Sequence, residues 1–263
     1  MASRDPARAR EMLAQYPEAR VVDSYHALVQ DPEIDAVYNP LPNSLHKEWT
    51  VRALEAGKHV LCEKPLALNA REAEEMAGTA ERTGHLLMEA FMYRFHPAMR
   101  AFVDGLREPL HVNATFAFPL RNRQDIRMQA GLGGGALMDV GCYTVSVSRW
   151  ILGEPTDVSA RAHVSNGVDV TTAALLGFGD GSTASLWVSF ESPEEQELKV
   201  VTRGEVLKRS RPFTAYRDPH DPYQLMVESF ADSILHGRPV HIPLDDSIGN
   251  MRVIDEIKKA FSS

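Results

Sequence analysis

The sequence predicts two consecutive folded units of different class: an α/β unit with a parallel sheet, then an α+β unit with an open, mainly antiparallel sheet and helices on one face. Two observations carry this prediction. Up to about residue 92, apolar runs of strand length alternate with amphipathic helical segments, which is the pattern of parallel strands joined by helices. From residue 111 onward, short runs of alternating hydrophobicity are typical of antiparallel strands.

Helix and strand signals follow one another through the first unit. Asp5 followed by Pro6 begins a helix well, because the Asp carboxylate accepts orphan amide protons and Pro tolerates the first helical position. Gly57 and Gly84 stand where helices would end in a left-handed cap. The expected order is a helix over 5–16, a helix over 24–30, a strand over 34–38, a helix from 43 to Gly57, a strand over 59–62, a helix over 69–83 and a strand over 85–90.

The second unit is mostly strands, with one long helix inside it and one at its end. Turn residues such as Gly179-Asp180-Gly181 indicate a meander, and Asp246 or Ser247 caps the last helix. The pattern changes between residues 92 and 110, so we expect one domain over 1–92 and a second over 93–263. The segments expected in the second are strands over 111–118, 158–164, 170–178, 183–190 and 198–202 and a helix over 135–152.

Composition narrows the class of protein. A chain of 263 residues with 44% hydrophobic and 24% charged residues is ordinary for a globular protein. The net charge of −8 argues against a nucleic-acid partner, since duplex binding needs a concentrated basic face. Two cysteines without CxxC, and no signal peptide, favour the cytoplasm. No apolar run is long enough for a membrane span, and the ten histidines form no HExxH pattern, so we expect no metal.

The strand expected over 59–62 runs directly into Glu63-Lys64-Pro65. This places an ammonium group at the carboxyl edge of a parallel sheet, where ligands bind. A partly desolvated lysine there can have its pKa lowered far enough to exchange a proton with a substrate hydroxyl. The alternative is a solvated lysine in an ordinary loop between a strand and a helix.

Four segments together resemble the glucose-fructose oxidoreductase, inositol dehydrogenase and rhizopine catabolism (Gfo/Idh/MocA) family. They are Tyr38-Asn39-Pro40-Leu41-Pro42-Asn43-Ser44-Leu45-His46, Ala56-Gly57-Lys58-His59-Val60-Leu61-Cys62-Glu63-Lys64-Pro65, Met88-Glu89-Ala90-Phe91-Met92-Tyr93-Arg94-Phe95-His96-Pro97 and Gly133-Gly134-Gly135-Ala136-Leu137-Met138-Asp139-Val140-Gly141-Cys142-Tyr143. Their order and spacing match the family over nearly the whole chain. The resemblance implies an incomplete Rossmann-like nucleotide-binding domain over 1–92 and a substrate-binding and oligomerisation domain over 93–263.

The resemblance also implies catalytic and substrate-binding roles. Lys64 would be the general acid/base, assisted by Asp139 and Tyr143, and Arg94 would join Asp139 and Tyr143 in binding substrate. Positions 139 and 143 are four apart on one expected helix, so their side chains share a face. Without the resemblance, an Asp that offsets the helix dipole and a packed Tyr whose hydroxyl is satisfied are the favoured explanation of the two residues. A Tyr here, where other members have His, is similar to the glucose-fructose oxidoreductase, xylose dehydrogenase and dihydrodiol dehydrogenase subgroup.

The implied cofactor is NADP, with NAD disfavoured. The first residues resemble the end of the second strand of the nucleotide domain, where relatives bind the adenosine ribose. Ser3 and Arg4 suit a 2′-phosphate better than a 2′-hydroxyl, since a guanidinium pairs with phosphate in a fork. The residues expected to bind the cofactor are Ser3, Arg4, Asn39, Pro40, Leu41, His46, Glu63 and Lys64.

The run Gly131 to Ala136 matches the dinucleotide pattern GxGxxG/A but stands in the wrong context. A true fingerprint follows the first strand of a βαβ unit, whereas this run follows the polar segment 122–129. In the family, this glycine run belongs to the substrate side. The phosphate-binding fingerprint itself is expected upstream of residue 1, on a first strand and helix outside this sequence.

These observations favour an NADP(H)-dependent oxidoreductase that acts on a carbinol or carbonyl carbon of a sugar or polyol. Two alternatives stay open: a cofactor-free binding or dimerisation remnant of the family, and a trans-dihydrodiol dehydrogenase. A homodimer or homotetramer through the second sheet is expected, because the strand over 183–190 reads as apolar on both faces. Further pocket candidates that could equally be surface or interdomain charges are Glu89, Arg94, His96 and Arg127.

Overall fold

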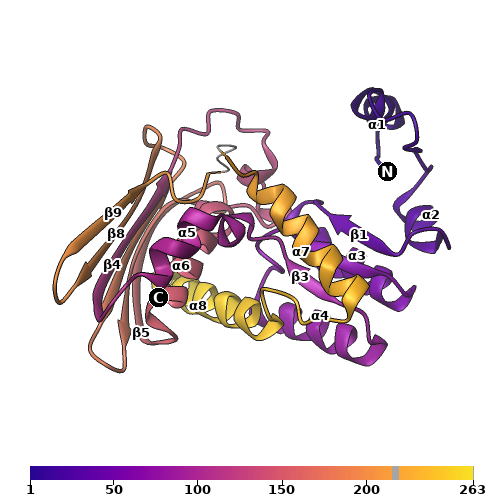
Figure 1. Ribbon diagram of the computed structural model, residues 1–263. Helices are drawn as coiled ribbons and strands as arrows, with labels where there is room; N and C mark the ends of the chain where they lie inside the picture. The colour runs from indigo at the N-terminus through magenta and orange to yellow at the C-terminus, as the bar shows by residue number, and fades with distance from the viewer. Residues whose placement is uncertain (215–218, 263) are drawn as a thin grey trace.

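The computed structural model describes residues 1–214 and 219–262 and contains two sheets that lie side by side (Figure 1). A three-stranded sheet has the order β1-β2-β3, and a six-stranded sheet has the order β5-β6-β7-β4-β8-β9. The predicted fold class is confirmed: a Rossmann-like parallel sheet is followed by a larger, mixed sheet with helices.

The first residues form a small lobe beside the parallel sheet. Helix α1 (Pro6–Leu13) begins at Asp5, whose Oδ1 accepts hydrogen bonds from the amides of residues 7 and 8, and it ends earlier than the expected residue 16. Helix α2 (Tyr25–Gln30) is capped by Ser24. An isolated parallel bridge joins Ala2 to Val22. Between this bridge and the first strand lies a cavity of about 400 Å³.

The parallel sheet is built as the sequence predicts. Strands β1 (Ala36–Asn39), β2 (His59–Cys62) and β3 (Leu87–Glu89) pair in parallel, so their carboxyl ends share one edge. Helix α3 (His46–Glu55) follows a 3₁₀ turn, η1 (Asn43–Leu45), and connects β1 to β2. Helix α4 (Ala70–Thr83) connects β2 to β3, with Asn69 as its cap and Gly84 in the left-handed conformation at its end.

The six-stranded sheet is mixed, not a simple meander. Strand β4 pairs in parallel with β7 and antiparallel with β8, which places a sequence-distant strand at the centre of the sheet. The last strand was not expected, because its run of polar and basic residues gives no apolar alternation. The strands are β4 (Pro109–Ala117), β5 (Pro155–Ser165), β6 (Val168–Phe178), β7 (Thr183–Ser189), β8 (Glu195–Thr202) and β9 (Val206–Ser210).

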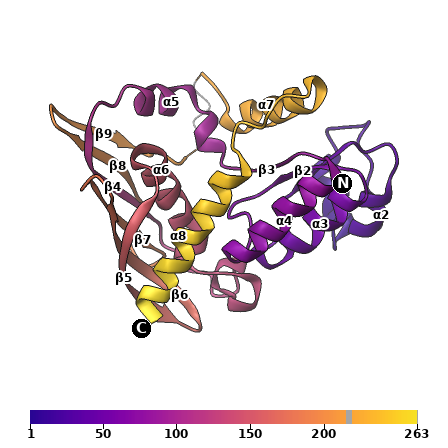
Figure 2. The same cartoon turned by 90° about the horizontal axis from the view of Figure 1, so that it is seen from below.

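Helices cover one face of this sheet and connect it to the parallel sheet (Figure 2). The last helix packs against both α4 and β5, so the end of the chain touches both sheets. No helix among residues 1–214 and 219–262 is long and apolar enough to cross a membrane. The helical segments are η2 (Met92–Phe95), α5 (Pro97–Asp104), η3 (Ile126–Met128), η4 (Ala130–Leu132), the π-helix η5 (Leu137–Gly141), α6 (Cys142–Leu152), α7 (Pro222–His236) and α8 (Leu244–Ser262).

The opposite face of the six-stranded sheet is open (Figures 1 and 2). The expectation that β7 is apolar on both faces is wrong, because its outward positions carry Thr183, Ser185 and Ser189, with Trp187 as the exception. Cross-strand pairing places Trp187 opposite Ala173 of β6, and Leu175 is half exposed two residues further along. The open face is therefore polar with a small apolar centre.

Candidate active site

A cavity of about 680 Å³ lies between the carboxyl ends of β1 and β2 and the helical side of the second sheet. Four kinds of group form its wall: strand-end loops, the glycine run, aromatic side chains and a few charged groups. The residues are Tyr38, Pro40, Leu41, Asn43, His46, Glu63, Lys64, Met92, Phe116, Phe118, Ile126, Arg127, Leu132, Gly133, Gly134, Asp139, Val140, Tyr143, Glu194, Gln196, Phe213, Thr214 and Tyr223.

Lys64 reaches from the parallel sheet to the second domain. It follows β2, and its Nζ donates to the backbone carbonyl of Asp139 at 2.9 Å. The same ammonium group lies 3.1 Å from Asp139 Oδ1 and 5.1 Å from the centre of the Tyr143 ring. The structure thus brings together the three residues that the sequence proposed as catalytic.

The direction of the Lys64 pKa differs from the sequence expectation. Burial alone would lower the pKa of the ammonium group, as expected, but the carboxylate of Asp139 raises it, and the net effect places the pKa well above its usual range. The expectation that the Lys64 pKa is lowered is therefore wrong. Lys64 carries its proton here, ready to donate it.

Asp139 and Tyr143 come from a helix with an irregular start. Asp139 lies in the π-helix η5, and Tyr143 lies one turn later at the start of α6. Single π-turns inside helices are common at functional sites, because they rotate side chains out of the regular helical register. Burial raises the pKa of the Tyr143 hydroxyl well above its usual range. Rings that pack around Tyr143 are Phe91, Tyr93, Phe116 and Phe213.

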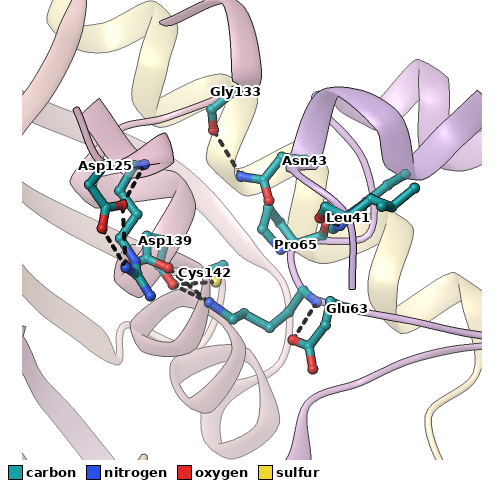
Figure 3. A network of polar contacts seen from close by, with 11 residues as sticks. Leu41, Asn43, Glu63, Pro65, Asp125, Gly133, Asp139 and Cys142 are labelled. Atoms are coloured by element: carbon teal, nitrogen blue, oxygen red, sulfur yellow. Dashed lines mark hydrogen bonds and ion pairs between the residues drawn. The ribbon is translucent and has the colours of Figure 1, made fainter. Parts of the chain in front are cut away.

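Arg127 is a second cation at Asp139. Its Nε lies 3.0 Å from Asp139 Oδ2, and its guanidinium also contacts Asp125 at 3.2 Å. Figure 3 shows Asp125 and Asp139 close to each other. From the sequence alone, Arg127 is only one of several pocket candidates, because Asp139 is twelve residues away and the fold brings the two together.

The glycine run connects the two sides of the cavity. The side chain of Asn43, at the end of the parallel sheet, donates to the carbonyl oxygen of Gly133 at 2.8 Å (Figure 3). Gly133 has a positive φ of 76°, and a side chain there would overlap Leu68 and Asn43. The glycine run therefore allows the two sides of the cavity to pack closely. This agrees with the expectation that the run belongs to the substrate side of the site.

Buried side chains at the end of β1 and in the segment that follows it hold the loops that line the cavity. Asn39 is buried, and its amide donates to the carbonyl of His46 at 3.2 Å and to Thr50 at 3.1 Å. The ring nitrogens of His46 lie 2.7 Å from the carbonyl oxygen of Leu41 and 2.9 Å from that of Pro65. Burial lowers the pKa of His46, which disfavours its charged form. These contacts fix the loops that follow β1 and β2.

Glu63 has a partner that the sequence did not suggest. Its carboxylate accepts a hydrogen bond from the Tyr38 hydroxyl at 2.5 Å, and both residues line the cavity. Burial, and then Glu63, raise the pKa of Tyr38 far above its usual range. Tyr38 is 48% exposed, so this pair presents a polar edge that is open to a ligand.

Four expected site residues do not line this cavity: Ser3, Arg4, Asn39 and Arg94. Arg94 is buried, forms an ion pair with Asp246 and stacks over Trp150, 4.7 Å from the ring centre. It supports the interior and does not reach the cavity wall. Ser3 and Arg4 lie beside the bridge at Ala2, and the Ser3 hydroxyl accepts a hydrogen bond from the amide of Asp5. The structure does not bring these two to the other candidates.

Two family models cover most of the chain. Residues 1–91 match the oxidoreductase family with the NAD-binding Rossmann fold, and residues 104–206 match the GFO/IDH/MocA C-terminal domain. The chain belongs to the Gfo/Idh/MocA oxidoreductase family. Membership confirms the resemblance found in the four sequence segments and identifies the chain as an NAD(P)-binding oxidoreductase.

Several named Gfo/Idh/MocA proteins are similar to this chain. D-xylose 1-dehydrogenase (NADP(+)) 2 of Haloferax volcanii is 38% identical over 98% of this chain and 87% of its own length. Trans-1,2-dihydrobenzene-1,2-diol dehydrogenase of Mus musculus is 37% identical over 73% of this chain and 60% of its own. The crystal structure of KijD10, a 3-ketoreductase from Actinomadura kijaniata in complex with NADP and TDP-benzene, aligns with this chain with a TM-score of 0.85 and 30% sequence identity. The alignment covers 98% of this chain and 88% of KijD10.

Proposed function

We propose that this protein transfers a hydride between NADP(H) and a carbinol or carbonyl carbon of a sugar or polyol, with Lys64 as the general acid/base. The observation that carries the proposal is the position of the Lys64 ammonium group. It lies at the carboxyl edge of a parallel sheet, in the wall of a cavity, and is bonded to Asp139. Ligands of parallel α/β sheets bind at this edge.

The expected charge state suits proton donation to a developing alkoxide. In the reducing direction, Lys64 gives its proton to the substrate oxygen while the carbonyl carbon receives the hydride. In the oxidising direction, Lys64 must first lose its proton and then accept the hydroxyl proton. Tyr143, whose raised pKa keeps it neutral, can donate a hydrogen bond to the same oxygen. Asp139 holds the ammonium group in place in both directions.

The residues on the sheet side fit the nicotinamide end of the cofactor. Pro40, Leu41 and Glu63 line the cavity beside Lys64, on loops fixed by Asn39 and His46. When bound, NADP(H) supplies the hydride acceptor or donor. For the adenosine end we propose Ser3 and Arg4, because the exposed guanidinium suits the 2′-phosphate and the neighbouring Asp5 carboxylate caps α1.

An uncharged, hydroxyl-rich substrate suits the rest of the wall. Among the described residues, the cations that line the cavity are Lys64 and Arg127, and both are paired with Asp139. Glu194 and Gln196 add polar acceptors, and Phe116 and Phe213 form a stacked pair that can pack on the apolar face of a sugar ring. The named xylose dehydrogenase supports a pentose or hexose as the first substrate to test.

Replacing Lys64 by Met tests the assignment. In a chain that carries the complete nucleotide domain, we expect Lys64→Met to lower kcat for oxidation of D-xylose with NADP⁺ by roughly a hundredfold or more, because a general acid/base contributes about that much. Lys47→Met is the matched control, since this partly exposed lysine on α3 pairs with Glu75 outside the cavity. Turnover in Lys64→Met equal to that of the control would refute the role of Lys64.

Cofactor titration separates the enzyme from a cofactor-free remnant. In a chain that includes the GxGxxG segment expected upstream, fluorescence titration with NADPH and with NADH should show saturable binding and a preference for NADPH. Absence of binding to either would favour the remnant, in which the cavity serves another ligand. A preference for NADH would contradict the role given to Ser3 and Arg4.

A second candidate is oxidation of a cyclic trans-diol. The aromatic wall formed by Phe116, Phe118, Tyr143 and Phe213 favours it, and two similar proteins are named trans-1,2-dihydrobenzene-1,2-diol dehydrogenases. The kcat/KM values for D-xylose and for the dihydrodiol, measured side by side, decide between the two substrates.

A further inference from the structure

The carboxylate of Asp139 is shared between two cations. Lys64 Nζ lies 3.1 Å from Oδ1, and Arg127 Nε lies 3.0 Å from Oδ2, so each oxygen has its own positive partner. The Asp139 and Lys64 side chains are 16% and 15% exposed, whereas Arg127 is 43% exposed. The pair at Oδ1 is therefore the better shielded from solvent, and the pair at Oδ2 is the more exposed.

Arg127 is held at Asp139 by its own turn. The amide of Arg127 donates to Asp125 Oδ1 at 3.0 Å, and its guanidinium donates to both oxygens of the same carboxylate at 3.2 and 3.3 Å. The carbonyl oxygen of Arg127 accepts a hydrogen bond from the amide of Gly135 at 2.9 Å. The turn η3 and the glycine run thus fix the guanidinium without help from a ligand.

A carboxylate that faces a lysine favours the charged ammonium form, and a second cation on the same carboxylate weakens that effect. Lys64 must lose its proton before it can act as a base, so the strength of its attraction to Asp139 matters for one direction of the reaction. We propose that Arg127 is a positioning residue that acts through Asp139 to determine how readily Lys64 releases its proton. The proposal rests on the role of Lys64 proposed above.

Other groups near Lys64 do not replace Arg127 in this role. Among the described residues, Arg127 is the only cation besides Lys64 that forms an ion pair with Asp139. The remaining charged or titratable groups that face Lys64 are Glu63 from its own loop, Cys142 and Tyr143 from α6, His46 from α3 and Tyr223 from α7.

The first test measures the protonation of Lys64 without any catalytic assay. Trace acetylation with acetic anhydride at pH 9 modifies only neutral amines, and mass spectrometry reports the yield at Lys64 relative to Lys47. Removing the guanidinium in Arg127→Gln should lower that yield about tenfold, equivalent to roughly one pKa unit. Arg127→Lys, which keeps the charge, should restore most of it, and Arg123→Gln on the same loop should change nothing.

The second test uses the direction of the reaction. In Arg127→Gln, oxidation with NADP⁺ should fall about tenfold near neutral pH and recover as pH rises, because more neutral Lys64 then forms. Reduction with NADPH should keep its rate, since it uses the protonated amine. Equal losses in both directions at every pH, or an unchanged acetylation yield, would overturn the proposal. A changed yield together with full activity in Lys64→Met would instead refute the general acid/base role alone.

Discussion

The buried carboxyl group of Glu89 leads to a prediction about stability that is independent of catalysis. Glu89, at the end of β3, is fully buried, and its Oε1 accepts a hydrogen bond from the amide of Leu66. Burial raises its pKa to about 7. Glu89 therefore lies beneath the loop that carries Lys64 and does not line the cavity.

The raised pKa means that folding favours the protonated form of Glu89. Its contribution to stability is complete below the unfolded pKa of about 4.5 and is lost as pH rises through about 7. Glu89→Gln should thus gain stability over the wild type between pH 4.5 and pH 8, by on the order of 3 kcal/mol. Urea unfolding of both proteins at the two pH values measures this difference.

Glu75→Gln is the contrasting variant for that experiment. Hydrogen bonds from Lys47 and Arg71 lower the pKa of this exposed carboxyl, so its pH dependence has the opposite sign. If Glu89→Gln and the wild type lose stability in parallel as pH rises, Glu89 does not titrate near neutrality in the folded protein.

At the residue scale, the strand end indicated Lys64, the family resemblance implied Asp139 and Tyr143, and the fold places the three together. It could not predict Arg127 as a partner of Asp139, because that contact depends on how the turn η3 folds back over the π-helix. Nor could it show that Arg94 pairs with Asp246, which lies 152 residues away.

At the scale of elements, strong local signals were reliable and weak ones were not. Asn69 and Gly84 predicted both ends of α4, and β2 has the expected bounds. Helices α5 and α7 were missed, although Pro97 and Pro222 at their first positions were available as start signals. Strand β9 has no apolar alternation and is held by pairing with β8 alone.

The glycine run offers a test at the same scale. A side chain at Gly134 would overlap the backbone carbonyl of Arg127, whereas one at Gly131 meets nothing within 4 Å. Gly134→Ala should therefore destabilise the protein by about 1–3 kcal/mol, the usual cost of overpacking, and displace Arg127 from Asp139. Gly131→Ala should be nearly neutral. Thermal unfolding of both variants measures the difference, and equal melting temperatures would contradict the packing argument.

At the scale of the whole molecule, the division at residues 92 and 93 stays a proposal, since α8 from the far end of the chain packs on both sheets. The sequence predicted two sheets of different class because strand pattern is local information. The parallel pairing of β4 with β7 could not be predicted in that way, since the two strands are separated by about seventy residues that include β5 and β6.

We also propose a homodimer or homotetramer through the open face of the six-stranded sheet. Ala173, Leu175 and Trp187 form the apolar centre of that face. Trp187→Glu should shift the protein toward the 29.2 kDa monomer in light scattering, because a buried unpaired carboxylate opposes association. Ser210→Glu, at the edge of the sheet, is the control. A wild type that is monomeric at micromolar concentration would refute the interface.

The contacts of α8 imply an order of events during synthesis on the ribosome. The carboxylate of Asp255 accepts a hydrogen bond from the amide of Ala70, and Lys258 donates to the carbonyl of Leu68, across 185 and 190 residues of chain. The segment that carries these backbone groups emerges early, but its partners emerge nearly 190 residues later. The packing beside Leu68 is therefore completed only after α8 has left the ribosome, although the parallel sheet can form before that point.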